Sequence, residues 1–256
     1  MTDIALPVGW TLAAFDAVDS TNDEAIKRAE DGAAEGAIVW SRQQLAGRGR
    51  RGRDWQSPLG NMYASIVVRP DCPPDQAAQL GFVTAIAVGE TASGLLPASS
   101  SSASNRVTYK WPNDVQVDGA KIAGILLESA PGADGKVAYV VIGTGINVEW
   151  KPGETAYPVA SLTSLGAKAS VDRVLEAYCR NLAKWLGIWR RDGFAVIRST
   201  WLARAGNLGQ IIDVKAGQES CRGRFSQLDE HGAIILEIEG GTTRRITAGE
   251  IFPVAA

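Results

Sequence analysis

The stretch that decides the fold reads VTYKWPNDVQVDGAKIAGILL and occupies residues 107–127. Three runs in it are rich in apolar and β-branched residues, as short strands are: 107–111, 115–117 and 121–127. Asp118-Gly119, between the last two runs, is a sequence signal of the tight turn that joins antiparallel strands. The stretch therefore predicts antiparallel neighbours, with Lys121 just past a tight turn.

On both sides of this stretch, strands and helices alternate. Apolar runs predict further strands at residues 10–18, 37–42, 61–69 and 137–142. Helical spacing of apolar residues predicts helices at residues 20–31, 75–96, 171–191 and 194–205. Ser20 or Thr21 is a suitable N-cap for the first helix, and the serine-rich residues 97–105 predict a flexible surface loop. These elements together predict a mixed α/β fold.

From residue 206 the pattern changes to short alternating segments separated by glycine-containing turns. Several short strands at this spacing within about 50 residues are typical of a small β-barrel. All eight tryptophans lie before this change, between Trp10 and Trp201. We predict a large domain at residues 1–205 and a small β-barrel domain at residues 206–256.

Composition excludes several classes of protein. The 256 residues carry 26 basic and 28 acidic side chains, which argues against a protein that binds nucleic acid through its bulk charge. Three cysteines without a CxxC pair argue against a disulfide scaffold or a structural zinc site. No apolar run is long enough to span a membrane, and the N-terminus lacks the features of a signal peptide. We expect a cytoplasmic protein that neither binds membranes nor holds a metal through its own side chains.

The single histidine, His231, lies in the predicted barrel. A Ser-His-Asp or Cys-His mechanism in the larger domain is therefore excluded, and so are histidine metal sites there. The remaining chemistry must depend on positioning and charge, as in phosphoryl or nucleotidyl transfer.

An unusual cluster of arginines, GRGRRGRDW, occupies residues 47–55. Four arginines within six residues produce a local positive field, and the glycines between them let the backbone approach a ligand closely. The spacing matches neither a Walker A loop nor a dinucleotide-binding GxGxxG motif. An anionic ligand is one interpretation, and a solvated basic loop or an RNA-contacting patch are the alternatives. Lys110 and Lys121 follow on predicted strands, where a positioned lysine could neutralise a carboxylate and a phosphate.

Five motifs, in this order and spacing, resemble the biotin protein ligase family. They are Asp-Ser-Thr-Asn at 19–22, Gln-Leu-Ala-Gly-Arg-Gly-Arg-Arg-Gly at 44–52 with Trp55, Lys-Trp-Pro-Asn-Asp at 110–114, Lys-Ile-Ala-Gly-Ile-Leu at 121–126, and Gly-Thr-Gly-Ile-Asn at 143–147. The resemblance runs from about residue 16 to residue 148. It implies a mixed-sheet catalytic domain like that of class II synthetases, and a C-terminal SH3-like barrel.

The resemblance also implies a reaction in two steps. Biotin would react with ATP and Mg²⁺ to give biotinyl-5′-AMP and pyrophosphate, and the biotin would then pass to a lysine of a biotin carboxyl carrier protein, as in acetyl-CoA carboxylase. Lys121 and Arg50 would be catalytic. The implied biotin-binding residues are Ser20, Thr21, Asn22, Gln44, Arg48, Gly49, Arg50, Lys121, Gly124 and Gly145. The implied nucleotide-binding residues are Arg50, Arg51, Trp55, Asn113, Lys121 and Asn147.

Other interpretations of the sequence stay open. A lipoate or octanoate ligase or transferase of related fold is the nearest alternative, and it would need a pocket for a straight acyl chain. A nucleic-acid-binding module would use the arginine cluster, but the rest of the larger domain is neutral. Only about ten residues precede the first predicted strand, so we expect no helix-turn-helix domain and no binding to operator DNA. A homodimer is one option for the oligomeric state.

Overall fold

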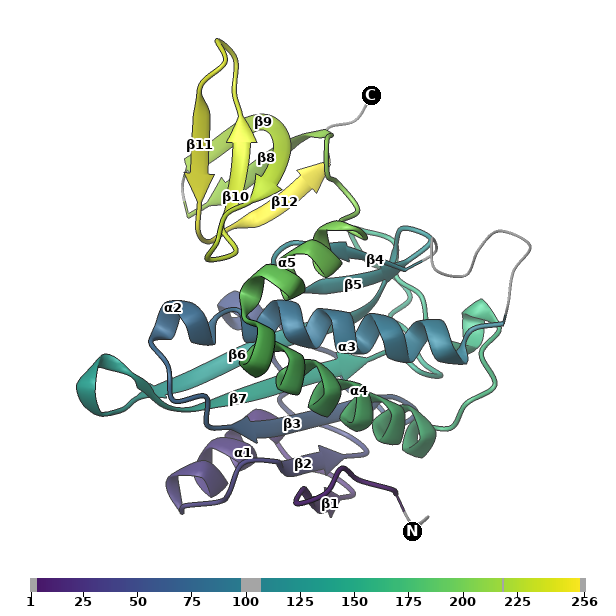
Figure 1. Cartoon of the computed structure of the whole chain (residues 1–256). Coiled ribbons are helices and arrows are strands. Elements are labelled where there is room, and N and C mark those ends of the chain that lie inside the picture. Colours follow the sequence, from purple (N-terminus) through teal and green to yellow (C-terminus); the bar gives the residue numbers. More distant parts are fainter. Residues whose placement is uncertain (1–3, 98–106, 218, 254–256) are drawn as a thin grey trace.

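The computed structural model describes residues 4–97, 107–217 and 219–253, and its larger part is built on a seven-stranded sheet (Figure 1). The strands follow the order β1-β2-β3-β7-β6-β5-β4. Their bounds are β1 Thr11–Phe15, β2 Ala37–Ser41, β3 Met62–Val68, β4 Val107–Lys110, β5 Asp114–Val117, β6 Ala120–Pro131 and β7 Val137–Ile146. Only β1 and β2 pair in parallel, and the other neighbours are antiparallel. This mixed sheet confirms the predicted fold class.

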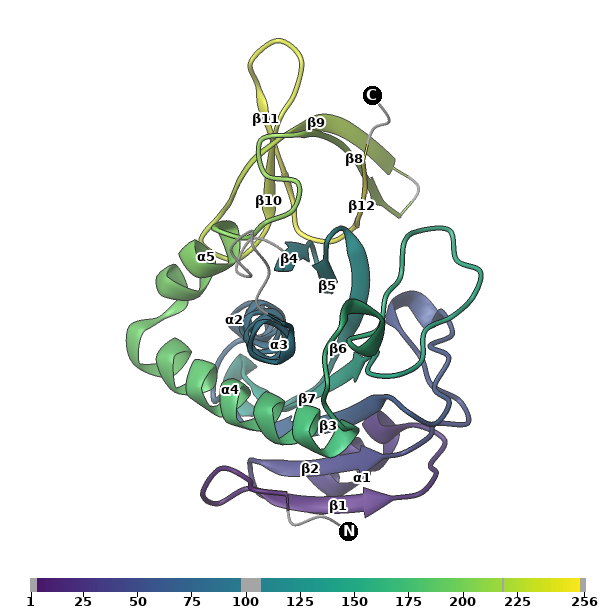
Figure 2. The ribbon, with the colours of Figure 1, turned by 90° about the vertical axis from the view of Figure 1, so that its right-hand side faces the viewer.

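Helices cover both faces of this sheet. They are α1 Thr21–Glu30, α2 Pro74–Ala77, α3 Leu80–Leu95, α4 Val171–Asp192 and α5 Phe194–Leu202. Strand residues point alternately to the two faces. Val39, Val67 and Val141 form a small core with α1, and their neighbours Ile38, Ile66 and Ile142 belong to the main core with α3 and α4. In Figure 2, α1 accordingly lies on the opposite side of the sheet from α3 and α4.

Residues beyond α5 form a second, smaller antiparallel sheet. Its order is β11-β10-β9-β8-β12. The strands are β8 Ile211–Ala216, β9 Glu219–Leu228, β10 Ile234–Glu237, β11 Thr243–Ile246 and β12 Glu250–Pro253. The Trp111 indole, on the larger part, donates a hydrogen bond of 3.1 Å to the Gly232 carbonyl of the small sheet. The boundary predicted between residues 205 and 206 lies in the connection from α5 to β8, and it remains a prediction.

Several local predictions agree with the structure. The Ser20 side chain caps α1 by accepting a hydrogen bond from the Asp23 backbone N–H. Asp118 and Gly119 both have positive φ, at 50° and 77°, as a two-residue hairpin turn requires. This turn places Lys121 at the second residue of β6.

Several predicted elements have other bounds in the structure. The strand expected at residues 10–18 ends at Phe15, and the helix expected at residues 194–205 ends at Leu202. The helix expected at residues 75–96 is divided into α2 and α3 by tight i→i+3 hydrogen bonds around Gln79, whose side chain accepts a bond from the Trp189 indole. The strand expected to stop at residue 142 continues to Ile146, because Gly143 and Gly145 pair with β3 on one side and β6 on the other. The serine-rich loop predicted at 97–105 lies outside the described residues from Ala98 onward. In the ranges that the structure describes, no helix is both long and apolar enough to cross a membrane.

Candidate functional site

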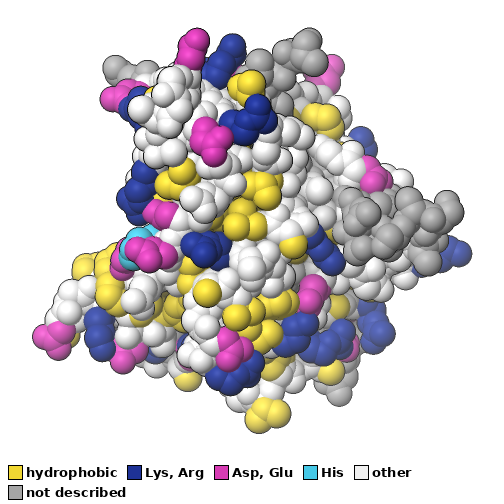
Figure 3. Space-filling view, turned by 45° about the horizontal axis from the view of Figure 1, so that its top comes forward, with side chains coloured by type: hydrophobic (Ala, Val, Ile, Leu, Met, Phe, Trp, Pro, Cys, Tyr) yellow, Lys and Arg dark blue, Asp and Glu magenta, His cyan; other side chains and the backbone are white. Residues whose placement is uncertain are grey.

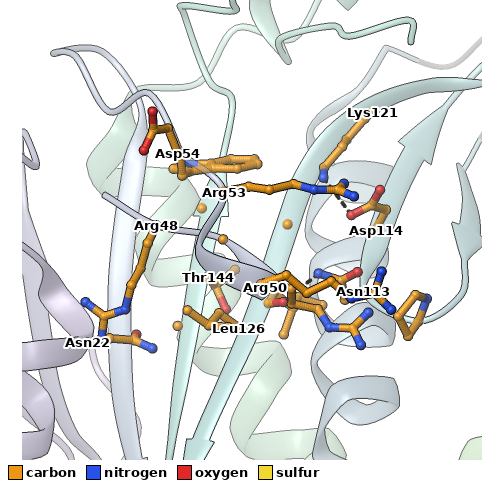
Figure 4. Close-up of a pocket in the computed structure, with 18 of the residues that line it drawn as sticks. Asn22, Arg48, Arg50, Arg53, Asp54, Asn113, Asp114, Lys121, Leu126 and Thr144 are labelled. Carbon is orange, nitrogen blue, oxygen red and sulfur yellow. Dashed lines mark hydrogen bonds and ion pairs between the residues drawn. The ribbon is translucent and has the colours of Figure 1, made fainter. Parts of the chain in front are cut away.

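A pocket opens beside β6 and β7, and the arginine cluster of residues 47–55, called here the arginine loop, forms one of its walls (Figure 4). All predicted site residues except Asn147 line it: Ser20, Thr21, Asn22, Gln44, Arg48, Gly49, Arg50, Arg51, Trp55, Asn113, Lys121, Gly124 and Gly145. These residues come from α1 and its N-cap, from the loops before β3 and before β5, and from two strands of the sheet, β6 and β7. Figure 4 shows Asn22 and Arg48 together at one end, and Lys121 and Asp114 facing each other at the other.

The end of the pocket near α1, called here the polar end, is lined by small polar side chains. Gln44 Oε1 accepts from Thr21 N at 2.8 Å and from Thr21 Oγ1 at 3.0 Å, and Gln44 Nε2 donates to Ser57 Oγ at 2.9 Å. The fully buried Ser65 on β3 stands 2.8 Å from Thr21 Oγ1 and 2.5 Å from Asn22 Oδ1. This network gives the polar side chains defined orientations, as recognition of a polar ring requires.

Ser65 was missed by the sequence analysis. It is a small polar residue in the middle of MYASIVV, a strand whose residues are all buried. A buried hydroxyl needs hydrogen-bond partners, and this requirement was the available signal.

The floor of the pocket is made by three glycines of β6 and β7. A Cβ atom at Gly145 would stand 2.6 Å from Trp55 Nε1, and one at Gly124 would stand 3.0 Å from Trp55 Cζ3. A Cβ atom at Gly143 would collide with Asn22 Oδ1. The glycines thus permit a close approach to the sheet, and in the structure the groups that approach are the Trp55 indole and the Asn22 amide. The implied contacts of Gly124 and Gly145 with biotin remain a prediction. Trp55 Nε1 is buried and has no hydrogen-bond partner among the described residues.

The other end of the pocket, called here the cationic end, contains a largely buried lysine. Lys121 Nζ lies 2.7 Å from Asp114 Oδ1, and the two side chains are only 12% and 18% exposed. The ammonium group also stands over the rings of Trp55 and Tyr157, at 5.2 and 5.6 Å from their centroids. Asp114 and Tyr157 were not predicted as site residues. The arrangement holds a positive charge at a fixed position beside an open space.

The four arginines of the loop have different surroundings. Arg48 pairs with Asp23 and Glu128, and hydrogen bonds from Arg48 to Asp23 chiefly raise its pKa. Arg53 pairs with Glu250 of the small sheet. Arg50 donates only a long hydrogen bond, 3.4 Å, to the Gly249 carbonyl, and burial together with the charge of Arg51 lowers its pKa. Arg50 is therefore the partly buried cation of the loop whose charge is least neutralised.

The backbone of the loop is itself folded back. Gly49 N donates to Arg53 O at 2.7 Å, and Trp55 N donates to Gly47 O at 2.9 Å. Arg51, at the tip, has a left-handed φ of 59°. Gly249 and Glu250, in and just after the turn between β11 and β12, complete this wall of the pocket. No site residue was predicted in the C-terminal part of the chain.

The two predicted nucleotide-facing asparagines are both engaged by backbone. Asn113 Nδ2 donates to Ile125 O at 2.8 Å, and Asn113 still lines the pocket. Asn147 Nδ2 donates to Ala160 O at 3.1 Å, and Asn147 is not among the lining residues. The side chain of Asn147 holds the loop after β7 in place. Across the part of the chain that the structure describes, no group of three or more His, Cys, Asp or Glu side chains is arranged to hold a metal ion.

Comparison with known proteins gives two family matches. Residues 14–147 match the model of the biotin/lipoate A/B protein ligase family, and residues 208–252 match that of the biotin protein ligase C-terminal domain. The chain is 40% identical over 242 residues to a biotin--[acetyl-CoA-carboxylase] ligase of Paracoccus denitrificans, covering 91% of this chain and 97% of that protein. It is 31% identical to the bifunctional ligase/repressor BirA of Escherichia coli, covering 91% of this chain and 71% of that protein.

Among solved structures, the chain resembles a biotin protein ligase from Aquifex aeolicus in complex with biotin and ATP. The TM-score is 0.79 at 24% identity, and the match covers 94% of this chain and 97% of that one. The likeness extends over both sheets, because the aligned part includes nearly the whole chain.

Proposed function

The chain belongs to the biotin/lipoate A/B protein ligase family and is a ligase, and from this premise we propose that its acid substrate is biotin. The proposed reaction joins biotin to ATP and then transfers it to a protein lysine. The observation that carries the proposal is the two-ended pocket, which has ordered hydrogen-bonding groups at the polar end and Lys121 with Arg50 toward the cationic end.

In the first proposed step, a carboxylate oxygen of biotin attacks the α-phosphorus of Mg-ATP. A bond forms between this oxygen and the α-phosphorus. The bond between the α-phosphorus and the oxygen that bridges to the β-phosphorus breaks, and pyrophosphate leaves with that oxygen. Lys121 and Arg50 offset the repulsion between the two anions and the charge that develops on the phosphorus oxygens. Asp114, 2.7 Å from Lys121 Nζ, keeps the ammonium group in position. The step needs no nucleophile from the protein, in agreement with the absence of histidine from the larger part.

In the second proposed step, a lysine amine of a biotin carboxyl carrier domain attacks the carbonyl carbon of biotinyl-5′-AMP. An amide bond forms, AMP leaves with the oxygen, and the amine proton passes to water. The mixed anhydride must be shielded from water until the amine arrives. The arginine loop, which forms a wall of the pocket together with Gly249 and Glu250, would provide this shield. An acetyl-CoA carboxylase type of carrier is the proposed acceptor.

The rival acid, lipoate or octanoate, fits the polar end less well. A straight acyl chain offers no partner to the second N–H of Asn22, the one that Glu128 does not accept, whereas the ureido ring of biotin offers both donors and an acceptor. The nucleic-acid alternative is weakened because Arg48 and Arg53 are already paired with carboxylates. On the face seen in Figure 3, basic and acidic side chains are interspersed and do not gather into one basic patch. That the protein binds no operator DNA stays a prediction.

The test is exchange of labelled pyrophosphate into ATP in the presence of biotin, lipoate, octanoate or no acid. We expect exchange with biotin alone, followed by transfer of biotin to an added carrier domain when pyrophosphate is removed. Exchange with lipoate or octanoate but not with biotin would overturn the proposal. Transfer to the carrier domain without exchange would contradict the adenylate step.

A further inference from the structure

A glutamate on β6 that the reaction does not use, Glu128, joins two parts of the pocket. Its Oε2 accepts a hydrogen bond of 2.6 Å from Asn22 Nδ2. Its two carboxylate oxygens lie 3.1 and 3.0 Å from Arg48 Nη2. The side chains of Glu128 and Arg48 are 31% and 30% exposed, so this pair is shielded from solvent more than a surface salt bridge is.

The partners of Asn22 fix the orientation of its amide. Oδ1 accepts from the buried Ser65 hydroxyl at 2.5 Å, and Nδ2 donates to Glu128, so the oxygen and the nitrogen are each defined by their partners. Gly143 leaves space for this amide directly against β7, where a larger residue would displace it. One N–H of Asn22 is left for the contents of the polar end. Glu128 therefore holds the Asn22 amide in the orientation in which Nδ2 has its second N–H available to a ring bound in the pocket.

The same carboxylate restrains the arginine loop. Arg48 is the first arginine of the loop, and its guanidinium also contacts Asp23 and Ser20 Oγ at 2.7 and 3.2 Å. The Asp23 side chain is 57% exposed, so solvent screens its attraction to Arg48. Glu128 is the less exposed of the two carboxylates. The C-terminal end of the loop is held by two hydrogen bonds: Gln44 Nε2 donates to Ser57 Oγ, and Ser57 Oγ donates to the Trp55 carbonyl.

We propose that Glu128 is a positioning residue that fastens the arginine loop, through Arg48, to the asparagine that faces the ring of the acid substrate. Closure of the loop and recognition of the ring then depend on one carboxylate, and a substrate ring that engages Asn22 stabilises the closed loop. The identity of the ring rests on the proposed function, whereas the fastening of the loop does not.

The first variant to compare with the parent protein is Glu128→Gln, which keeps an oxygen to accept from Asn22 but loses the charge that attracts Arg48. The matched control is Asp23→Asn, which removes the other carboxylate of Arg48 and does not touch Asn22. Trypsin cleaves after arginine, so the initial rate of cleavage within residues 48–53, with no biotin added, reports how often the loop opens. Biotin affinity is measured on the same samples by calorimetry.

For Glu128→Gln we expect loop cleavage about tenfold faster and biotin binding about tenfold weaker, as for loss of one charge-assisted hydrogen bond. For Asp23→Asn we expect loop cleavage to accelerate as well, since Arg48 loses a charged partner, but biotin binding to change less than about threefold, because Asp23 makes no hydrogen bond to Asn22. Loop cleavage of Glu128→Gln at the wild-type rate, or a loss of biotin affinity no larger than that of Asp23→Asn, would overturn the proposal.

A double-mutant cycle separates fastening from general destabilisation. Arg48→Ala should accelerate cleavage at the remaining arginines as Glu128→Gln does, and the two changes together should add little to either one. Additive effects would contradict a shared interaction. If the parent protein binds no biotin but the cleavage results hold, the proposed function fails and the fastening of the loop stands. If biotin binds but Glu128→Gln alters neither readout, the fastening fails and the proposed function stands.

Discussion

Substitution of Gly145 by alanine tests whether the floor of the pocket must stay bare. The new Cβ would stand 2.6 Å from Trp55 Nε1, 2.7 Å from Cε2 and 2.9 Å from Cζ2. Carbon atoms in contact ordinarily lie about 3.5–4.0 Å apart, so one of the two groups must move by about 1 Å. The backbone of β7 cannot easily move, because Gly145 is paired with Tyr63 on β3 and with Gly124 on β6. The indole must therefore withdraw from the sheet.

Overpacking of this kind costs about 1–3 kcal/mol, and this cost would reduce the binding free energy of any ligand that packs against the sheet at Gly145. If biotin packs on the same floor, its affinity should fall roughly 5- to 150-fold. The melting temperature should change little, since the indole borders an open pocket and can swing away. Gly124→Ala should have a smaller effect, because its Cβ would stand 3.0 Å from the indole at closest.

Calorimetry with biotin and a thermal melt measure the two quantities. Gly187→Ala is the matched control, because its Cβ would meet nothing within 4 Å and the residue lies in α4, where alanine favours the helix. It should bind biotin as the parent protein does. Wild-type affinity in Gly145→Ala, or a larger loss in Gly124→Ala than in Gly145→Ala, would refute the reasoning.

Three further predictions concern the site and one ion pair. Lys121→Ala should slow formation of the adenylate about 10²- to 10³-fold in single-turnover measurements, with the fold retained, and an unchanged rate would exclude the proposed role. Arg50→Ala should release the adenylate at least about tenfold faster, as followed by dissociation of labelled biotinyl-5′-AMP. Burial opposes ionisation of Glu35, but bonds from Arg190 and Arg69 lower its pKa below the usual 4.5, so its stabilising effect is present above that pH and is lost on acidification. Glu35→Gln should accordingly reduce the free energy of unfolding at pH 7, by less than about 1 kcal/mol, and the reduction should shrink progressively as the pH falls below 4.5.

Local signals explain why much of the fold was predictable. The Asp118-Gly119 turn and the Ser20 cap depend on residues a few positions apart, and both are found in the structure. The end of β7 was not predictable in the same way. Gly143 and Gly145 weaken a strand considered alone, yet pairing with β3 and β6 on both sides keeps them extended.

The residues of the site that the sequence did not predict interact with partners that are distant in sequence, not with residues a few positions away. Glu128 meets Asn22 across 106 residues, and Arg53 meets Glu250 across 197. No period or spacing in the chain connects such pairs. They become visible only when the sheet brings β6 beside α1 and the small sheet comes to lie against the arginine loop.

In the arginine loop, partners that are distant in sequence decide which arginines keep an unpaired positive charge. In the sequence its four arginines are equivalent members of one basic cluster, and the prediction was a single positive field. In the structure Arg48 and Arg53 are largely neutralised by carboxylates that lie elsewhere in the chain, which leaves Arg50 partly buried beside Arg51 with a lowered pKa. A cation that has lost water without gaining a carboxylate is stabilised most by an anion that comes to it. Because its neighbours are paired, Arg50 is the arginine of the loop that, under the proposed function, we expect to attract the phosphate of the nucleotide together with Lys121.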